Sequence, residues 1–115
     1  MFVEVKLNPG DVLINEGEPS DCIYILHSGE LRVSKFKDGH PIDLGFIKAG
    51  EIVGEISFLD NLSRSATVKA QTSCVVKMMN RAHFNEIIKD SHPLLQSLII
   101  NLASRLRKTS SKLKI

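Results

Sequence analysis

The feature that most constrains the fold of this chain is a single change in the spacing of its apolar residues, close to Met79. Before it, short runs of alternating apolar and polar residues are separated by turn-forming residues, as in β-strands. After it, apolar residues recur every three or four positions, as in amphipathic helices. This order predicts a mainly β body followed by C-terminal helices.

Eight runs with strand character precede the change. The turn between the fourth and the fifth contains Asp38-Gly39, a pair that favours the positive φ angles of a tight hairpin. Short strands at this spacing indicate a sandwich or a barrel. The runs occupy residues 2–7, 12–15, 22–27, 31–36, 42–47, 52–53, 65–70 and 73–79.

Two helices are expected after the β body of about residues 2–79. Asn80 is a suitable N-cap for a helix over about 81–89, and Pro93 suits the first turn of a second helix over about 92–110. The apolar stripe of the second helix is expected to pack on the β body or, alternatively, to form the seam of a homodimer. Its members are Leu94, Leu95, Leu98, Ile99, Ile100, Leu102, Ala103 and Leu106.

The composition is that of one globular domain, which we expect to span residues 1–115. A chain of 115 residues has room for a single core, and its 43% hydrophobic and 24% charged residues are ordinary proportions. No apolar run approaches the roughly 20 residues that cross a bilayer, and the N-terminus lacks the pattern of a signal peptide. We therefore expect no membrane association and a cytoplasmic location.

The cysteines and histidines indicate neither a metal site nor another cofactor. Cys22 and Cys74 lie far apart in apolar runs, as buried reduced thiols do. The four histidines lack the spacing of zinc ligands.

Basic residues are concentrated at the C-terminus. Five of the fifteen lie from Arg105 onward, including Lys112 and Lys114, and the other ten stand against thirteen acidic residues. Cations at the end of a helix complement its dipole, so the tail needs no nucleic acid to explain it. Since no element that would enter a DNA groove follows, specific nucleic-acid binding is not expected.

The segment 54–67, GEISFLDNLSRSAT, has the residues of a binding site. Glu55 offers an acceptor for hydroxyl groups, and Arg64 offers a planar cation suited to phosphate oxygens. Residues 56–59 are expected to form one helical turn whose N–H groups face an anion, with Phe58 as a core anchor. A phosphorylated sugar would satisfy both ends; alternatively, Glu55 and Arg64 are ordinary surface charges.

An enzyme is not expected, and there are no candidate catalytic residues. A hydrolase set could be drawn only from Ser57, His83 and Asp60, and the sequence around Ser57 is no nucleophile elbow.

Two stretches of the chain resemble the cyclic nucleotide-binding domain family. Residues 50–57 (GEIVGEIS) with 64–67 (RSAT) are similar to its phosphate-binding cassette, and residues 17–33 (GEPSDCIYILHSGELRV) are similar to its β-roll signature. The similarity extends over about residues 3–107. It implies a double-stranded β-helix, a jelly-roll-like β-roll, with a short cassette helix followed by a hinge helix and a lid helix.

The resemblance also implies roles for individual residues. Glu55 would bind the ribose 2′-hydroxyl and Arg64 the cyclic phosphate, while the backbone of Ser57 and Ser65 would hold the phosphate. Val53 stands where a phenylalanine is frequent. The implied ligand-binding residues are Val53, Gly54, Glu55, Ile56, Ser57, Arg64, Ser65 and Ala66.

The base of the nucleotide would meet the lid helix. The chain has no tryptophan, and its one tyrosine is Tyr24, so the lid cannot stack an aromatic ring on the base. Leu102, Arg105 and Leu106 are the candidates for a cap, and Arg105 could stack its planar group. In the family, serine at the position of Ser65 occurs in bacterial regulators that respond to cyclic AMP, which favours this ligand over cyclic GMP.

The implied function is a sensor whose helices reposition on binding and signal to an unidentified effector domain or protein. The family's usual helical segment before the β-roll is missing, which indicates either a lost docking element or an excerpt of a longer protein. The alternative is a β-roll used only for dimerisation or docking, which binds no nucleotide.

Overall fold

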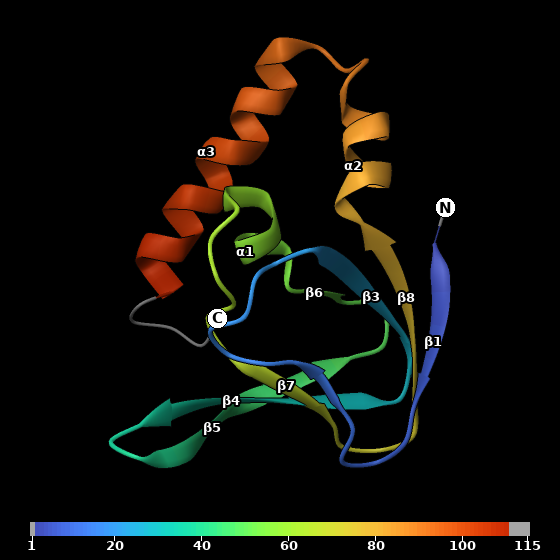
Figure 1. Ribbon diagram of the computed structural model, residues 1–115, viewed down its shortest axis with the longest axis vertical. Helices are drawn as coiled ribbons and strands as arrows, with labels where there is room; N and C mark the ends of the chain where they lie inside the picture. The colour runs from blue at the N-terminus through green and yellow to red at the C-terminus, as the bar shows by residue number, and fades with distance from the viewer. Residues whose placement is uncertain (1, 111–115) are drawn as a thin grey trace.

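The computed structural model describes residues 2–110. Lys112 and Lys114 of the basic tail lie outside this range. Two four-stranded antiparallel sheets form the lower part of the molecule and three helices the upper part (Figure 1). The first sheet holds, in order, β1 (Val3–Leu7), β8 (Cys74–Asn80), β3 (Cys22–Ser28) and β6 (Ile52–Val53). The second holds β2 (Val12–Ile14), β7 (Thr67–Ala70), β4 (Glu30–Lys37) and β5 (His40–Lys48).

The core lies between the two sheets and is apolar. Inward and outward residues alternate along the strands, as in β4, where Leu31 and Val33 are buried and Arg32 between them is not. Such alternation places every second side chain in the interior. The prediction of a mainly β fold with C-terminal helices is confirmed. The largest fully enclosed side chains are Phe58, Leu26, Leu31, Val53 and Val76.

The hairpin between β4 and β5 forms at the predicted turn. Lys37 pairs with His40, and the two residues between them, Asp38 and Gly39, have φ angles of 53° and 81°. Two successive positive φ angles match the twist of the strands that they connect.

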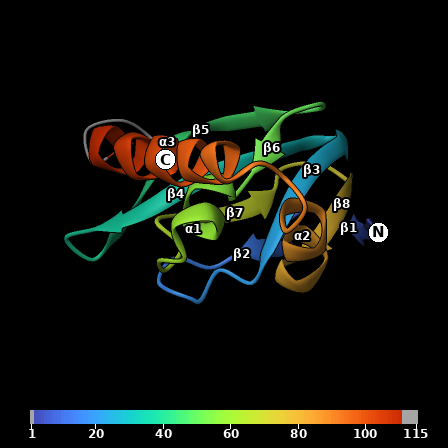
Figure 2. The ribbon, with the colours of Figure 1, turned by 90° about the horizontal axis from the view of Figure 1, so that it is seen from above.

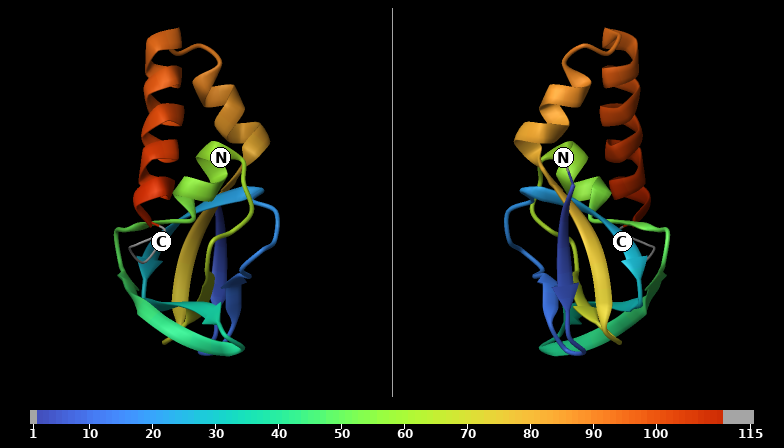
Figure 3. Two further views of the ribbon diagram at one scale, coloured as in Figure 1. Left: turned by 90° about the vertical axis from the view of Figure 1, so that its left-hand side faces the viewer. Right: turned by 90° about the vertical axis from the view of Figure 1, so that its right-hand side faces the viewer.

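The three helices surround the upper end of the β-roll. They are α1 (Glu55–Asp60), α2 (Arg81–Ile88) and α3 (Pro93–Ser110). Asn80 caps α2 as predicted, because its side chain accepts a hydrogen bond of 2.9 Å from the N–H of His83. The helices α2 and α3 form an inverted V with α1 between its legs (Figure 3), and α1 is flanked by both of them when seen from above (Figure 2).

The prediction that the apolar stripe of α3 packs on the β body is wrong. The helix packs instead on α1, and Ala103, only 1% exposed, is its one buried residue among those whose side chains the structure describes. Each residue turns a helix by about 100°, so the side that carries Ala103 is not the side that carries Leu98 and Leu102. The leucines at 94, 95, 98, 102 and 106 are 48–64% exposed.

Two further observations concern the cysteines and the helices. Cys74 is buried as predicted, whereas Cys22 is only partly buried, because it lies at the start of β3 near the surface. Among the described residues, no helix is long and apolar enough to cross a membrane.

Candidate functional site

The site begins at the backbone of Gly54, directly before α1. Gly54 has φ 78° and ψ 17°, a left-handed conformation that glycine adopts without the steric cost of a Cβ. A Cβ at this position would overlap Nη1 of Arg64 and crowd a methyl carbon of Ile14. The glycine therefore sets the turn into α1 and lets a guanidinium lie against the main chain.

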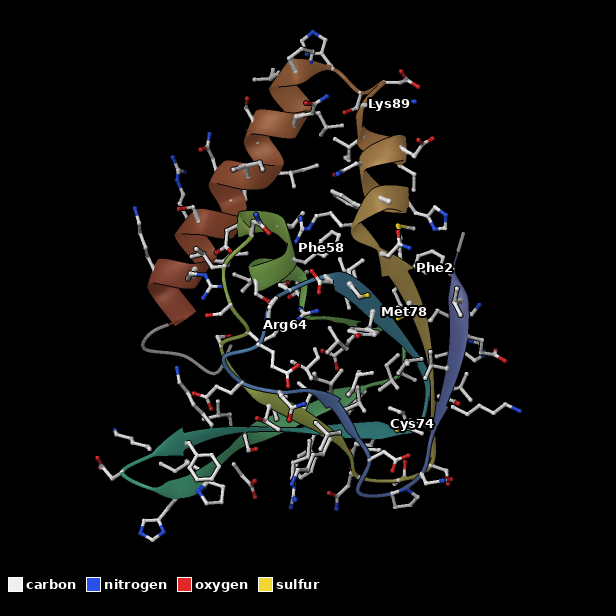
Figure 4. The ribbon with its side chains drawn as sticks, in the orientation of Figure 1. Phe2, Phe58, Arg64, Cys74, Met78 and Lys89 are labelled. Carbon is white, nitrogen blue, oxygen red and sulfur yellow. The ribbon has the colours of Figure 1, made fainter. Side chains whose placement is uncertain are left out.

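Arg64 occupies the space that Gly54 leaves open, and it is only 6% exposed. Its Nη1 donates to the carbonyl oxygen of Gly54 (2.8 Å) and to Oγ of Ser57 (3.1 Å). Its Nη2 donates to the carbonyl oxygen of Cys22 (2.5 Å). Figure 4 places the side chain below α1, inside the molecule. Arg64 thus ties the start of the helix to the start of β3.

Two donors of the Arg64 guanidinium have no hydrogen-bond partner among residues 2–110. A guanidinium carries five N–H groups, and the three bonds above leave the Nε–H and one Nη2–H. Unengaged guanidinium donors can hydrogen-bond the oxygens of a phosphate or carboxylate. Arg64 therefore keeps hydrogen-bonding capacity for an anion.

No carboxylate among residues 2–110 forms an ion pair with this buried cation. The ion pairs of the described residues join Arg32 to Asp43, Lys89 to Glu86 and Arg107 to Asp60, and none includes Arg64. Burial lowers the pKa of Arg64, while Tyr24, Cys22 and Asp21 oppose that shift. A bound anion would supply the charge that the protein does not.

Glu55 is the first residue of α1 and is half-buried. Burial raises the pKa of its carboxyl, and a backbone hydrogen bond and the charge of Arg64 partly offset that rise. The structure thus places the two predicted charged residues at the same end of α1, without a direct ion pair among the described residues.

The remaining predicted residues of the segment are buried or half-buried. Val53 and Ala66 are buried, and Ile56 and Ser65 are half-buried. A pocket of about 200 Å³ opens beside Arg64, lined mainly by β2, β3 and the loop between them. Its lining includes Tyr24 and Arg64 but neither Glu55 nor Ser65.

Several contributors to the site were not identified from the sequence. Ser20 donates to Oγ of Ser57 (3.3 Å), and the ring of Tyr24 lies 5.9 Å from the Arg64 guanidinium. The carbonyl of Cys22 comes from 42 positions earlier in the chain than Arg64. All three residues lie in the stretch 17–33 that resembles the β-roll signature, but the sequence alone does not show that the closure of the roll brings them to the cassette.

Arg81, at the start of α2, was also missed. Its Nη2 donates to the carbonyl oxygens of Ser20 (2.6 Å) and Phe58 (2.9 Å). Its guanidinium lies 4.3 Å from the centre of the Phe58 ring, and Phe84 meets that ring edge-on at 5.0 Å. These contacts join the last turn of α1 to α2.

The predicted cap residues lie on α3, away from its contact with α1. Leu102, Arg105 and Leu106 are exposed, whereas Ala103 is buried and Arg107 pairs with Asp60 of α1. Their role against a base remains a prediction.

The β-roll places a buried arginine with unengaged hydrogen-bond donors beside the start of a short helix, and two further helices pack beside that helix. This arrangement defines a ligand-binding module of regulatory type. Residues 4–91 match the family of cyclic nucleotide-binding domains. The chain belongs to this family.

Known proteins with similar sequence or structure include kinases, transcription regulators and enzymes. The cGMP-dependent protein kinase egl-4 of Caenorhabditis briggsae is 33% identical over 102 residues, which are 89% of this chain and 13% of the kinase. The cAMP-activated global transcriptional regulator CRP of Escherichia coli O157:H7 is 31% identical over 102 residues, 87% of this chain and 49% of the regulator. The cAMP-bound EAL enzyme Bd1971 has a TM-score of 0.84 at 28% identity, over 96% of this chain and 29% of the enzyme. The chain thus spans half or less of the length of each.

Proposed function

We propose that this chain is a regulatory module that binds cyclic AMP, in preference to cyclic GMP, and repositions α2 and α3 to signal to a partner domain or protein. The observation that carries the proposal is the state of Arg64. It is buried, it forms no ion pair with a carboxylate among the described residues, and its Nε–H and one Nη2–H are unengaged. A cyclic phosphate supplies one negative charge and oxygens that accept hydrogen bonds from a guanidinium.

The other residues of the segment fit the rest of such a ligand. Glu55 would accept a hydrogen bond from the ribose 2′-hydroxyl, and backbone N–H groups of Ser57 and Ser65 would hold the phosphate. Val53, Gly54, Ile56 and Ala66 would form the wall around it. Leu102, Arg105 and Leu106 would meet the base if the end of α3 closes over the site.

The choice of base rests on Ser65 and on the relatives. CRP is named for activation by cAMP and the egl-4 kinase for dependence on cGMP, and Bd1971 has been solved with either nucleotide bound. Since relatives use both, the preference for cyclic AMP is the finer part of the proposal.

The proposed mechanism is a shift in the populations of two arrangements of α2 and α3, and it involves no chemical reaction. A ligand moves the helices only if it binds one of their arrangements more tightly than the other. The contacts of Arg81 and Arg107 with α1 provide a physical route, because α1 forms the wall of the site and also touches both helices. We propose that the module acts in the cytoplasm and is not itself an enzyme.

Calorimetric titration of the chain with cyclic AMP, cyclic GMP and 5′-AMP tests this function. Cyclic AMP should bind most tightly, and Arg64→Ala should weaken it more than tenfold, because truncating one partner of a buried charge contact costs about 2–5 kcal/mol. Arg64→Lys should also weaken binding, since lysine keeps the charge and loses the fork.

The matched control is Arg32→Gln, which removes an arginine of β4 outside the segment 53–66. It should leave affinity unchanged. Absence of saturable binding by either cyclic nucleotide, with no thermal stabilisation by the ligand, would instead favour the β-roll scaffold that binds no nucleotide.

The exposed leucines of α3 support a homodimer as the second part of the proposal. Five leucines along one 18-residue helix are about half exposed or more, and apolar surface of this extent favours association. Light scattering of the chain and of its Leu98→Lys variant tests it: a dimer that persists in the variant would exclude a seam through Leu98.

A further inference from the structure

An ion pair that no sequence pattern predicts joins the lid helix α3 to the cassette helix α1. Arg107, near the end of α3, donates through Nε to Oδ2 of Asp60, and through Nη2 to Oδ1 of Asp60 (3.2 Å). The pair is bidentate and largely enclosed: the side chain of Asp60 is 9% exposed and that of Arg107 is 26% exposed. Both features distinguish it from the exposed pairs that add little to stability.

Asp60 places a negative charge at an unfavourable end of α1. It is the last residue of α1, where a negative charge opposes the helix dipole. Its Oδ1 also accepts a hydrogen bond from the N–H of Leu62 (3.1 Å), across Asn61, which has a left-handed φ of 58°. Asp60 therefore closes the turn that leads from α1 towards Arg64, while Arg107 supplies the cation that its carboxylate lacks.

Arg107 also reaches that turn directly. Its Nη2 lies 3.4 Å from the carbonyl oxygen of Ser63, to which it donates, and Ser63 is the residue before Arg64. One side chain of the lid thus holds both ends of the segment 60–63, which connects the helix to the arginine of the site.

We infer that Arg107 and Asp60 are positioning residues for nucleotide binding. Their pair fixes the end of α3 on the cassette. It thereby also fixes the position of the neighbouring cap candidates Arg105 and Leu106 relative to the cassette. It also fixes the turn that enters Arg64. The inference rests on the proposed function, and it adds that affinity depends on two residues that do not touch the ligand.

The pair can be broken without loss of the fold. On its other side, α1 is held by Arg81, through the carbonyl and the ring of Phe58, and Phe58 itself is fully buried. Removing Arg107 or Asp60 should therefore loosen the end of α3, while α1 and the β-roll keep their places.

The first experiment measures binding of cyclic AMP and stopped-flow dissociation of a fluorescent cyclic AMP analogue for the wild type, Asp60→Asn, Arg107→Gln and the double variant. We expect dissociation about tenfold faster in each single variant with little change in association, because a lid that is held less tightly opens more often and most changes in affinity appear in the off-rate. The double variant should be no worse than the single ones, since the two residues act through one contact.

The second experiment needs no ligand. Amide hydrogen exchange of the free protein should be faster over residues 94–108 in Asp60→Asn and Arg107→Gln than in the wild type, with exchange of β3 and β8 unchanged, because local opening raises exchange only where contacts are lost. Arg32→Gln, which breaks the exposed 3.8 Å pair with Asp43, is the control and should match the wild type in both experiments.

The outcomes separate the two proposals. If the wild type binds no cyclic nucleotide, the proposed function fails, and the exchange data still report whether the pair holds α3. If the wild type binds and the variants dissociate at its rate, or bind more tightly, the positioning role is overturned. Faster exchange confined to α3 together with faster dissociation supports it.

Discussion

The interior of the β-roll and the layer of helices above it are held together in different ways. Between the sheets lie fully enclosed apolar side chains, among them Leu26, Leu31 and Val76. In the helical layer α2 has no buried residue. Its contacts with α1 are made by Arg81 and Phe84, and those of α3 include the pair of Arg107 with Asp60.

This difference indicates which part of the molecule can move. Apolar burial contributes about 25 cal/mol per Å² and has no preferred direction, so a filled core resists any rearrangement. A hydrogen bond contributes only about 1 kcal/mol net and can be exchanged for another of similar strength. The β-roll is therefore the fixed frame, and the helices are attached by a few contacts that a ligand could alter.

The largest expected effect comes from the frame. Leu26→Ala should destabilise the protein by about 2–5 kcal/mol, because it removes a fully enclosed side chain and leaves a cavity. Urea unfolding followed by circular dichroism measures this loss. Phe36→Ala, which truncates a side chain that is 63% exposed, should change stability by no more than about 0.5 kcal/mol. Similar losses in the two variants would mean that the enclosed core of the β-roll contributes no more to stability than its surface does.

A smaller effect is expected at the junction of frame and helices. Gly54→Ala places a Cβ against Arg64 at a residue with a left-handed φ, so it should cost about 1–2 kcal/mol from the backbone and also weaken cyclic AMP binding. Gly10→Ala is a matched control, because Gly10 has φ 91° and open space around its Cβ. It should cost the backbone energy and leave affinity unchanged; equal affinities in the two variants would speak against a role for the Gly54–Arg64 contact.

The smallest effect concerns the charge on Glu55. Because burial raises the pKa of Glu55 above its ordinary value of 4.5, the folded state holds the proton more tightly than the unfolded state. The contribution of Glu55 to the free energy of unfolding is therefore complete below pH 4.5. It is lost as the pH rises through the higher pKa that Glu55 has in the folded state. Glu55→Gln should therefore gain up to a few degrees in Tm relative to the wild type between pH 4 and pH 7, although it binds nucleotide less well. Glu4→Gln, an exposed change on β1, serves as the control, and a Tm difference that does not vary with pH would disprove the burial of Glu55.

Much of the frame could be predicted from the sequence because its signals are local. The alternation in the strands, the turn at Asp38-Gly39 and the cap at Asn80 each depend on a few neighbouring residues. The segment from Val53 to Ala66 could be found for the same reason, since most of its members are close in sequence.

The attachments of the helices could not be predicted, because they join residues that are distant in the chain. Arg81 meets Phe58 across 23 positions and Arg107 meets Asp60 across 47, and neither arginine has a pattern around it. The apolar stripe of α3 predicted burial, but spacing alone cannot say which side of a helix meets its neighbour. The side that packs on α1 is the one that carries Ala103, a small residue that permits close approach of the two helices.

The two flanks of α1 bear on how the chain can change in length. Gly54 and Asn61 both have left-handed conformations, with φ 78° and 58°, and they confine the helix to six residues. One residue inserted within it would rotate all that follows by about 100°, and Asp60 would no longer face Arg107. An insertion after Leu62 would leave Asp60 facing Arg107, but it would displace the carbonyl of Ser63 from Arg107. Insertions and deletions should therefore be selected against most strongly within the helix and less strongly in residues 61–63, even where exposed positions of the helix accept other residue types.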